Sequence, residues 1–413
     1  MRTKMMQARH CEGRSAEAIQ MQQIQGQPRR NAIPAKAGTH GRHMHGLRFW
    51  LAWIPAFERV KKLANRLKWG PQRRPREGGD PCQSLLLLDR WIPAFAGMTA
   101  VLVFTAHPAG AYEAYVSNEK SNTVSVIDTD KLEVVKTVKV GQRPRGIAVT
   151  MDGKSVIVAV GDDDTIQVID TKTKEVAGNL PSGPDPEFFA FGPGGKHLYV
   201  ANENNNTVTI VDTATQRQDG DIQVGVEPEG MVISPDGKFV VCTSETSNMA
   251  HFIDAKTHEI VANVLVGARP RFAVFKSDGS ELWVSSEVGG TVSVIDPVNH
   301  VVKKKIAFEV PGLRREAIQP VGINLTKDGK LAFISLGPSN RVAVVDGQTH
   351  EVLKYLLVGQ RVWHGAFTPD EKYLLVANGL SNDVSVIDVA GLKVIKSIQV
   401  GREPWGVAIE AQE

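Results

Sequence analysis

Short apolar runs separated by turn residues follow one another along the chain from Tyr112 onward. One unit, residues 140–180, contains four such runs, of which the first three are Gly146 to Thr150, Ser155 to Val160 and Thr165 to Ile169. Val, Ile and Thr dominate these runs, which is typical of half-buried strands. Asp152-Gly153 between the first two runs predicts a tight hairpin. Because no helical period appears, the unit is predicted to form four antiparallel β-strands.

The unit is repeated seven times. The third run of each unit ends in Val-Ile-Asp or a close variant, and five of the six steps between the closing aspartates are 42 residues, while one is 50. These aspartates are Asp128, Asp170, Asp212, Asp254, Asp296, Asp346 and Asp388. A fixed period of this length indicates a repeat protein, and four strands per repeat indicate a β-propeller.

The two ends of the repeat region predict how the ring closes. The first strand-like run, Ala114 to Asn118, matches the second strand of a unit, and Gly401 to Glu410 is a first strand with nothing after it. Pairing these two segments would remove the exposed edges of an open stack. We therefore predict an all-β fold for residues 112–413: a seven-bladed β-propeller of four-stranded antiparallel blades, closed by the N- and C-terminal strands.

The first 97 residues differ from the repeats. Residues 1–100 carry 18 Lys and Arg against 6 Asp and Glu, whereas the remainder carries 30 against 39. We interpret residues 1–97 as a basic leader of low order, disordered or not native, with a membrane- or nucleic-acid-binding tail as the alternative. The apolar run and small-residue site within residues 98–111 predict the remnant of a secretory signal peptide, too short to span a membrane. We therefore expect the protein to be exported.

Several function classes lack their motifs. Only one of the three cysteines, Cys242, lies in the repeats, so these contain no internal disulfide and no multi-cysteine metal site. The sequence has no G-x-S-x-G motif, and its two His-Glu pairs lack the second histidine of a zinc site. The acidic repeat region argues against nucleic-acid binding. We therefore predict no catalytic residue, no metal site and no cofactor.

The motifs YVSN, YVAN and VANG beside SVID resemble the YVTN family of β-propeller repeats. Runs such as VGQRPRGIAV, VGVEPEGM, SETSNMAHFID and EAIQPVGI resemble, over residues 113–410, the PQQ-dependent catabolism-associated β-propeller subgroup. The resemblance implies a periplasmic location and an accessory role in pyrroloquinoline-quinone-dependent alcohol oxidation, beside a dehydrogenase or transporter component. It implies no catalytic residues.

The candidate binding residues lie where the chain enters each innermost strand, because those strands line the channel of a propeller. Aligned on the recurring proline, two rings of mainly charged residues and two tryptophans are expected to converge, exposed to solvent, at one mouth of the channel. The first ring consists of Arg143, Asp185, Glu227, Arg269, Gln319, Arg361 and Glu403, and the second of Arg145, Glu187, Glu229, Arg271, Val321, Trp363 and Trp405. The equally supported alternative is a set of ion pairs between blades that hold the ring shut.

Three further features are expected on the same side. His364 replaces a glycine found in other units and is interpreted as a packed channel histidine, with ligand contact as the alternative. The loops between second and third strands are rich in Asn, which indicates either a recognition face or ordinary turn preference. The eight additional residues of the long step, within 308–319, are expected over the channel mouth.

The sequence thus favours a non-enzymatic, exported module that binds a partner protein or a small ligand at the channel mouth and polar loop face. Two alternatives stay open: a propeller enzyme of hydrolase or lactonase type, and a redox partner that binds the quinone through Trp363 and Trp405. We expect no nucleic-acid partner and no stable membrane span.

Overall fold

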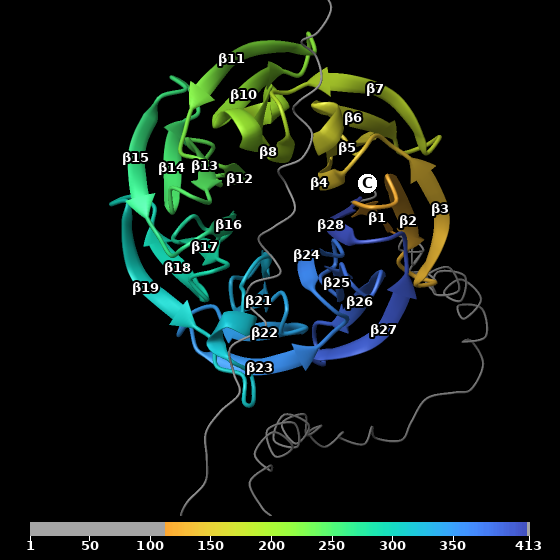
Figure 1. Cartoon of the computed structure of the whole chain (residues 1–413), viewed down its shortest axis with the longest axis vertical. Helices are drawn as coiled ribbons and strands as arrows, with labels where there is room; N and C mark the ends of the chain where they lie inside the picture. The colour runs from red at the N-terminus through yellow and green to blue at the C-terminus, as the bar shows by residue number, and fades with distance from the viewer. Residues whose placement is uncertain (1–111, 411–413) are drawn as a thin grey trace, which may run out of the picture. The chain divides into compact units, whose positions relative to one another are not determined.

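The computed structural model describes residues 112–410. The predicted leader and signal-peptide remnant lie outside the described residues. Seven four-stranded antiparallel sheets surround one axis, as Figure 1 shows. The sequence therefore predicted the fold class correctly. No helix in the described part of the chain is long and apolar enough to cross a membrane.

Each blade is named here in chain order, with its strands given from the axis outward. Blade 1 consists of β28 (Pro404–Ile409), β1 (Glu113–Asn118), β2 (Thr123–Asp128) and β3 (Glu133–Lys139). Blade 2 consists of β4 (Pro144–Val149), β5 (Ser155–Val160), β6 (Thr165–Asp170) and β7 (Glu175–Pro181). Blade 3 consists of β8 (Pro186–Phe191), β9 (His197–Asn202), β10 (Thr207–Asp212) and β11 (Arg217–Gln223).

The remaining blades follow the same order. Blade 4 consists of β12 (Pro228–Ile233), β13 (Phe239–Ser244), β14 (Met249–Asp254) and β15 (Ile260–Leu265). Blade 5 consists of β16 (Pro270–Phe275), β17 (Leu282–Ser286), β18 (Thr291–Asp296) and β19 (Val301–Ala307). Blade 6 consists of β20 (Ile323–Leu325), β21 (Leu331–Ser335), β22 (Arg341–Asp346) and β23 (Val352–Leu357). Blade 7 consists of β24 (Val362–Phe367), β25 (Tyr373–Asn378), β26 (Asp383–Asp388) and β27 (Lys393–Gln399). Four short 3-10 turns are η1 (Gly161–Asp163), η2 (Pro193–Gly195), η3 (Glu203–Asn205) and η4 (Arg315–Ala317).

Blade 1 closes the ring as the sequence predicted. β28 pairs antiparallel with β1, with Tyr115 opposite Ala408 and Val116 opposite Val407. All four of these side chains are buried. Two apolar layers, one on each side of β1, thus depend on the C-terminal strand.

The recurring Val-Ile-Asp segment has a structural explanation. In blade 1, Val126 and Ile127 are fully buried on opposite faces of the sheet. The Asp128 carboxylate accepts hydrogen bonds from the backbone N–H groups of residues 130 and 131, so it fixes the turn into the outermost strand. The equivalent Asp170 does the same for residues 172 and 173. Its hydrogen bonds, chiefly from Thr173, lower the pKa of the Asp170 carboxyl.

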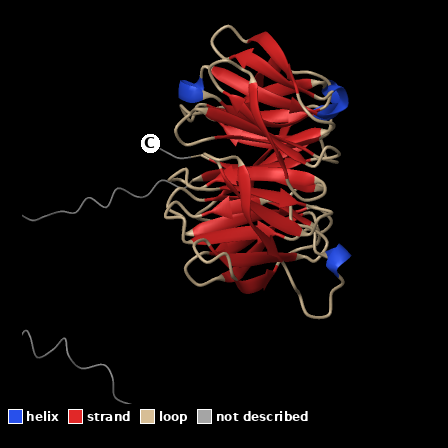
Figure 2. Cartoon of the chain, turned by 90° about the vertical axis from the view of Figure 1, so that its left-hand side faces the viewer, coloured by secondary structure: helices blue, strands red, loops and turns tan. Residues whose placement is uncertain are grey.

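Loops gather on two opposite faces of the propeller, which Figure 2 shows from the side. One of them, the mouth face, carries the loops from second to third strands and those from each outermost strand to the next innermost strand. The long loop before β20 starts on this face, but it does not cover the axis (Figure 1). Phe308, Val310 and Ile318 anchor it in the core between blades 5 and 6, and the N–H of Glu309 bonds to the Tyr355 hydroxyl of the outermost strand β23. The expectation that it lies over the channel was wrong, because its apolar residues are buried between blades 5 and 6, away from the axis.

Candidate functional site

A recurring hydrogen bond, the inter-blade clasp, holds the first ring: the backbone N–H of a ring residue donates to a side-chain oxygen of the preceding blade. Six of the seven first-ring residues adopt left-handed backbone angles, for example Arg269 with φ 56°. The N–H of Arg269 donates to the side-chain oxygen of Asn248 in the preceding blade, at 3.0 Å. The same bond, 21 residues apart in sequence, joins Arg143 to Asn122, Asp185 to Asp164, Glu227 to Asn206, Arg361 to Asn340 and Glu403 to Asn382. In six of the seven loops, an Asn or (in blade 2) Asp164 thus binds the next blade in addition to forming its own turn.

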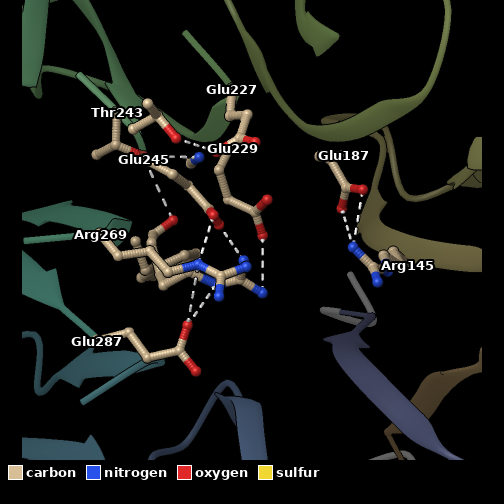
Figure 3. Close-up of polar contacts among 12 residues, drawn as sticks. Arg145, Glu187, Glu227, Glu229, Thr243, Glu245, Arg269 and Glu287 are labelled. Atoms are coloured by element: carbon tan, nitrogen blue, oxygen red, sulfur yellow. Dashed lines mark hydrogen bonds and ion pairs between the residues drawn. The ribbon is translucent and has the colours of Figure 1, made fainter. Parts of the chain in front are cut away.

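The two rings form ion pairs between blades 2 and 3. Arg145 donates from Nη1 to both carboxylate oxygens of Glu187, at 2.8 and 2.9 Å. Arg143 contacts the same carboxylate at 3.2 Å and pairs with Asp185 and Asp162. Glu187 is completely buried. Figure 3 shows the Arg145–Glu187 pair at one side of the mouth.

A second network joins blades 4 to 7. Arg271, only 4% exposed, pairs with Glu229 at 3.4 Å and with Glu245. Arg269 Nε lies 2.6 Å from Glu245, and Arg361 Nη2 lies 2.7 Å from Glu287. Burial raises the pKa of the Glu287 carboxyl, but Arg271 and Arg361 outweigh it, so that this pKa is lowered. The inter-blade alternative thus describes the contacts of most ring residues.

Four glutamates that the sequence analysis missed form a third ring. Each directly follows the end of a second strand: Glu119, Glu203, Glu245 and Glu287. Successive members are 84, 42 and 42 residues apart. This register, the same that identified the blades, could have found them. The first two rings contain as many acidic as basic residues, so the third ring gives the mouth an excess of four carboxylates.

The centre of the channel is filled by aromatic rings. At the position after the second ring, glycine alternates with a ring residue, so Phe188, Phe272 and His364 alternate with Gly146, Gly230, Gly322 and Gly406. The centroids of Phe188, Phe272 and His364 lie 4.9 to 5.2 Å from one another. Trp405 lies 4.5 Å from His364 and 4.7 Å from Phe188. The prediction of a packed histidine agrees with this arrangement, whereas Phe188 and Phe272 were not foreseen.

The alternating glycines allow this packing because they bring neighbouring innermost strands into close approach. A methyl group at Gly322 would lie 2.6 Å from the Trp363 carbonyl oxygen, and one at Gly230 would lie 2.5 Å from that of Arg271. Backbone atoms cannot yield easily at such distances. Four blades therefore place a glycine at this position, and three place an aromatic side chain there.

The expectation of solvent-exposed channel groups was wrong for several residues. Trp405 is 1% exposed, and His364, Arg271, Glu187 and Glu229 are also buried. Trp363 is half-buried, with the Arg361 guanidinium 4.1 Å and the Arg271 guanidinium 5.4 Å from its ring centre. The channel groups pack against one another instead of lining an open pore.

Burial shifts the protonation of three groups at the mouth. Burial, with Glu187 beside it, raises the pKa of Glu203 to about 7. Burial also raises the pKa of Glu229 well above its usual range, although Arg271 opposes the shift. Burial and the two arginines of the second ring hold the pKa of His364 far below 6.5, so this histidine is neutral. Glu229 and Glu203 are the carboxyls of the mouth that carry a proton most readily.

Three consecutive aspartates between β5 and β6, which as a run of acids could hold a cation, instead bond to protein groups of the mouth face. Asp162 pairs with Arg143, Asp163 accepts the backbone N–H of Gln142, and Asp164 accepts that of Asp185. The remaining first-ring residues, Glu227, Gln319 and Glu403, form no arginine–carboxylate ion pair in the described part of the chain. Glu227 contacts the Thr246 hydroxyl, Gln319 accepts a bond from Arg361, and Glu403 lines a surface hollow.

Two shallow hollows lie on the mouth face, one on each side of Leu380, whose side chain is 65% exposed. One, of about 370 Å³, is lined by Lys120, Arg402 and Glu403 among others. The other, of about 440 Å³, is lined by residues that include Arg269 and Arg361. The mouth face thus presents an exposed leucine with cationic side chains around it.

Comparison with solved structures shows the fold. The chain is similar to Kuenenia stuttgartiensis hydrazine synthase, with 23% identity and a TM-score of 0.62 over 68% of this chain and 94% of that one. A putative 6-phosphogluconolactonase from Bacteroides uniformis gives 18% identity and a TM-score of 0.62 over 73% and 99%. A functionally unknown protein from Desulfotomaculum acetoxidans gives 16% identity and a TM-score of 0.63 over 73% and 99%.

Comparison of sequences matches a smaller part of the chain than comparison of structures. No curated protein matches the chain. The family described as YNCE-like β-propeller matches residues 82–202. The chain is a seven-bladed β-propeller, and its matched segment is similar to the YNCE-like β-propellers.

Proposed function

We propose that the protein is an exported, non-enzymatic binding module and an accessory to a pyrroloquinoline-quinone-dependent alcohol oxidation system. It binds a partner protein, a periplasmic dehydrogenase or a transporter component, through the mouth face. The motif resemblance over residues 113–410 supports the system, and the surface around Leu380 supports the mode of binding.

The observation that carries the proposal is an exposed apolar side chain, Leu380, with exposed cationic side chains beside it. Leu380 lies between two hollows, and Lys120 and Arg402 are exposed beside it. A buried apolar contact with a charged rim is the usual anatomy of a protein interface. Arg402 donates a hydrogen bond from Nη2 to the Lys120 carbonyl oxygen at 2.9 Å, which orders part of this surface before a partner binds.

The test compares two matched substitutions on opposite faces. Leu380→Asp on the mouth face should abolish capture of a dehydrogenase or transporter component from the host periplasm. Val298→Asp should not, because Val298 is 82% exposed in the turn between β18 and β19, on the other face. Equal capture by both variants would contradict the proposed surface. Export is tested separately, since protein isolated from its host should begin near Tyr112.

A lactone hydrolase is the second candidate, and one observation favours it. Glu203 lies half-buried at the mouth with a pKa of about 7, which suits a general acid or base at neutral pH. The Bacteroides uniformis protein of similar fold is a putative 6-phosphogluconolactonase by name. Hydrolysis of a sugar δ-lactone that is lost in Glu203→Gln would establish this alternative, and its absence leaves the binding module.

The quinone-binding alternative has less support. Trp405 is buried, and two guanidinium groups lie against Trp363. A quinone could stack on either indole only by displacing these contacts.

A further inference from the structure

Two of the four third-ring glutamates pair with a second-ring arginine of the next blade, whereas Glu229 and Val321 occupy that position after Glu203 and Glu287. In the two pairs the arginine lies 26 residues after the glutamate. Glu119 pairs in this way with Arg145 at 3.3 Å, and Glu245 with Arg271. The residue 26 positions after Glu203 is Glu229, so a carboxylate stands where blades 2 and 5 have an arginine.

The acidic side chains around this place lie close together. One carboxylate oxygen from each of Asp185, Glu187 and Glu203 lies within 4.8 Å of the other two. Two oxygens bound to the same Ca²⁺ ion, each about 2.4 Å from it, are separated by at most about 4.8 Å. A single cation could therefore reach all three.

A second observation, independent of that cluster, comes from Glu229. It is 1% exposed, and neither of its carboxylate oxygens accepts a hydrogen bond. Its nearest cation, Arg271, lies 3.4 Å away and is shared with Glu245. Figure 3 shows Glu229 between Glu245 on one side and the Arg145–Glu187 pair on the other. A buried carboxylate without hydrogen bonds requires a compensating charge or a proton.

The charges are consistent with one divalent ion. When all are ionised, the carboxylates of Asp185, Glu187, Glu203 and Glu229 stand against the guanidinium groups of Arg143 and Arg145 and that of Arg271, which Glu229 shares with Glu245. At least one negative charge then remains uncompensated. Oxygen ligands in an irregular arrangement suit Ca²⁺, because Mg²⁺ demands near-ideal octahedral geometry.

We propose that the mouth between blades 3 and 4 binds one Ca²⁺ ion through Asp185, Glu187 and Glu203, with buried Glu229 as counter-charge. The ion takes the place of the arginine that blades 2 and 5 supply at this position. Arg143 and Arg145 compete for the same carboxylates, so we expect affinity in the range of about 0.1–1 mM, as in extracellular calcium modules. This inference does not rest on the proposed partner, because an accessory module and a hydrolase could both carry the ion.

The test uses the full chain freed of metal with a chelator. Calorimetric titration with CaCl₂ at pH 8 should give one site, and Ca²⁺ should raise the melting temperature more than Mg²⁺ does. Glu203→Gln should weaken Ca²⁺ binding about tenfold or more. Glu175→Gln, an exposed carboxylate of the outermost strand β7, should leave it unchanged.

Glu203→Lys supplies a tethered ammonium group and gives the second readout. It should melt at a higher temperature than the wild type in chelator and should not respond to Ca²⁺. The proposal is overturned if the wild type shows neither heat nor stabilisation at about 10 mM Ca²⁺, or if Glu203→Gln responds like the wild type. In the first case the carboxyls hold protons only, and in the second the ion binds elsewhere.

Discussion

Arg145 of blade 2 and Glu187 of blade 3 form a two-bond pair at 2.8 and 2.9 Å, with the carboxylate completely buried. This pair joins innermost strands that are not hydrogen-bonded to each other. It also places its guanidinium 5.8 Å from the centre of the Trp405 ring in blade 1. One arginine therefore ties three blades together near the axis.

Removing this arginine should destabilise the fold. Arg145→Ala leaves the Glu187 carboxylate buried and only partly compensated, a change that typically costs about 3–5 kcal/mol. Denaturant unfolding should detect the loss. Lys120→Ala, an exposed cation of the same face, serves as the control and should change the free energy of unfolding by less than about 0.5 kcal/mol. A small effect of Arg145→Ala would show that the pair does not hold the blades.

The glycines of the channel give a steric prediction. Gly322→Ala should destabilise the protein by about 1–3 kcal/mol, because the new methyl group would press against the Trp363 backbone. Gly178→Ala is the matched control, since a methyl group there meets nothing within 4 Å. Thermal melting of the two variants compares them directly, and equal melting temperatures would refute the close approach.

The fold was predictable because its determinants are local. Each strand is a short alternating run, and each turn has its own Asp or Asp-Gly chemistry, so a period of 42 residues identifies the blades. Ring membership also follows from this register. The position of Arg145 relative to Glu187 could thus be predicted from counting alone.

The burial of the rings could not be predicted in the same way. It depends on Phe188 and Phe272, whose side chains meet at the axis from blades far apart in sequence. The third ring was missed for another reason. Glu119 and Glu203 lie in loops whose Asn-rich composition resembles ordinary turns, and only the 26-residue relation to the second ring connects Glu119 with Arg145 and Glu203 with Glu229.

The inter-blade clasp predicts different outcomes for two substitutions at one position. Asn248→Gly keeps the left-handed backbone but removes the acceptor for the Arg269 N–H, at a cost of about 1 kcal/mol. Asn248→Asp should retain the bond, as Asp164 does in blade 2. Denaturant unfolding distinguishes them. If both variants lose the same stability, the side-chain hydrogen bond is not what Asn248 contributes.

Ring closure gives a prediction at the C-terminus. A chain that ends at Val400 lacks β28 and exposes the apolar layers around Tyr115 and Val116. The lost contacts should exceed the net stability of a typical domain, about 5–15 kcal/mol, so the truncated chain should not fold. Circular dichroism should show no cooperative melting. A chain that ends at Glu410 keeps β28 and should melt like the full protein.

The protonation of Glu203 makes stability depend on pH. The pKa of this carboxyl is about 7 in the folded protein and about 4.5 in the unfolded chain. Between these values the folded state holds a proton that the unfolded state has released. The free energy of unfolding should therefore fall as pH rises from about 4.5 to 7, and should be constant with respect to this group outside that window.

The full shift would correspond to about 3 kcal/mol, but Glu203 is only half-buried, so solvent screening reduces the expected fall to about 1–2 kcal/mol. Glu203→Gln cannot titrate, and its stability should fall less over the same window. Without metal at pH 8 it should be more stable than the wild type, because the repulsion with Glu187 is gone. Denaturant unfolding at pH 5 and pH 8 in a chelator measures both effects. Parallel pH profiles for the two proteins would mean that Glu203 does not hold the proton, and that another carboxyl, with Glu229 the first candidate, is responsible for any slope.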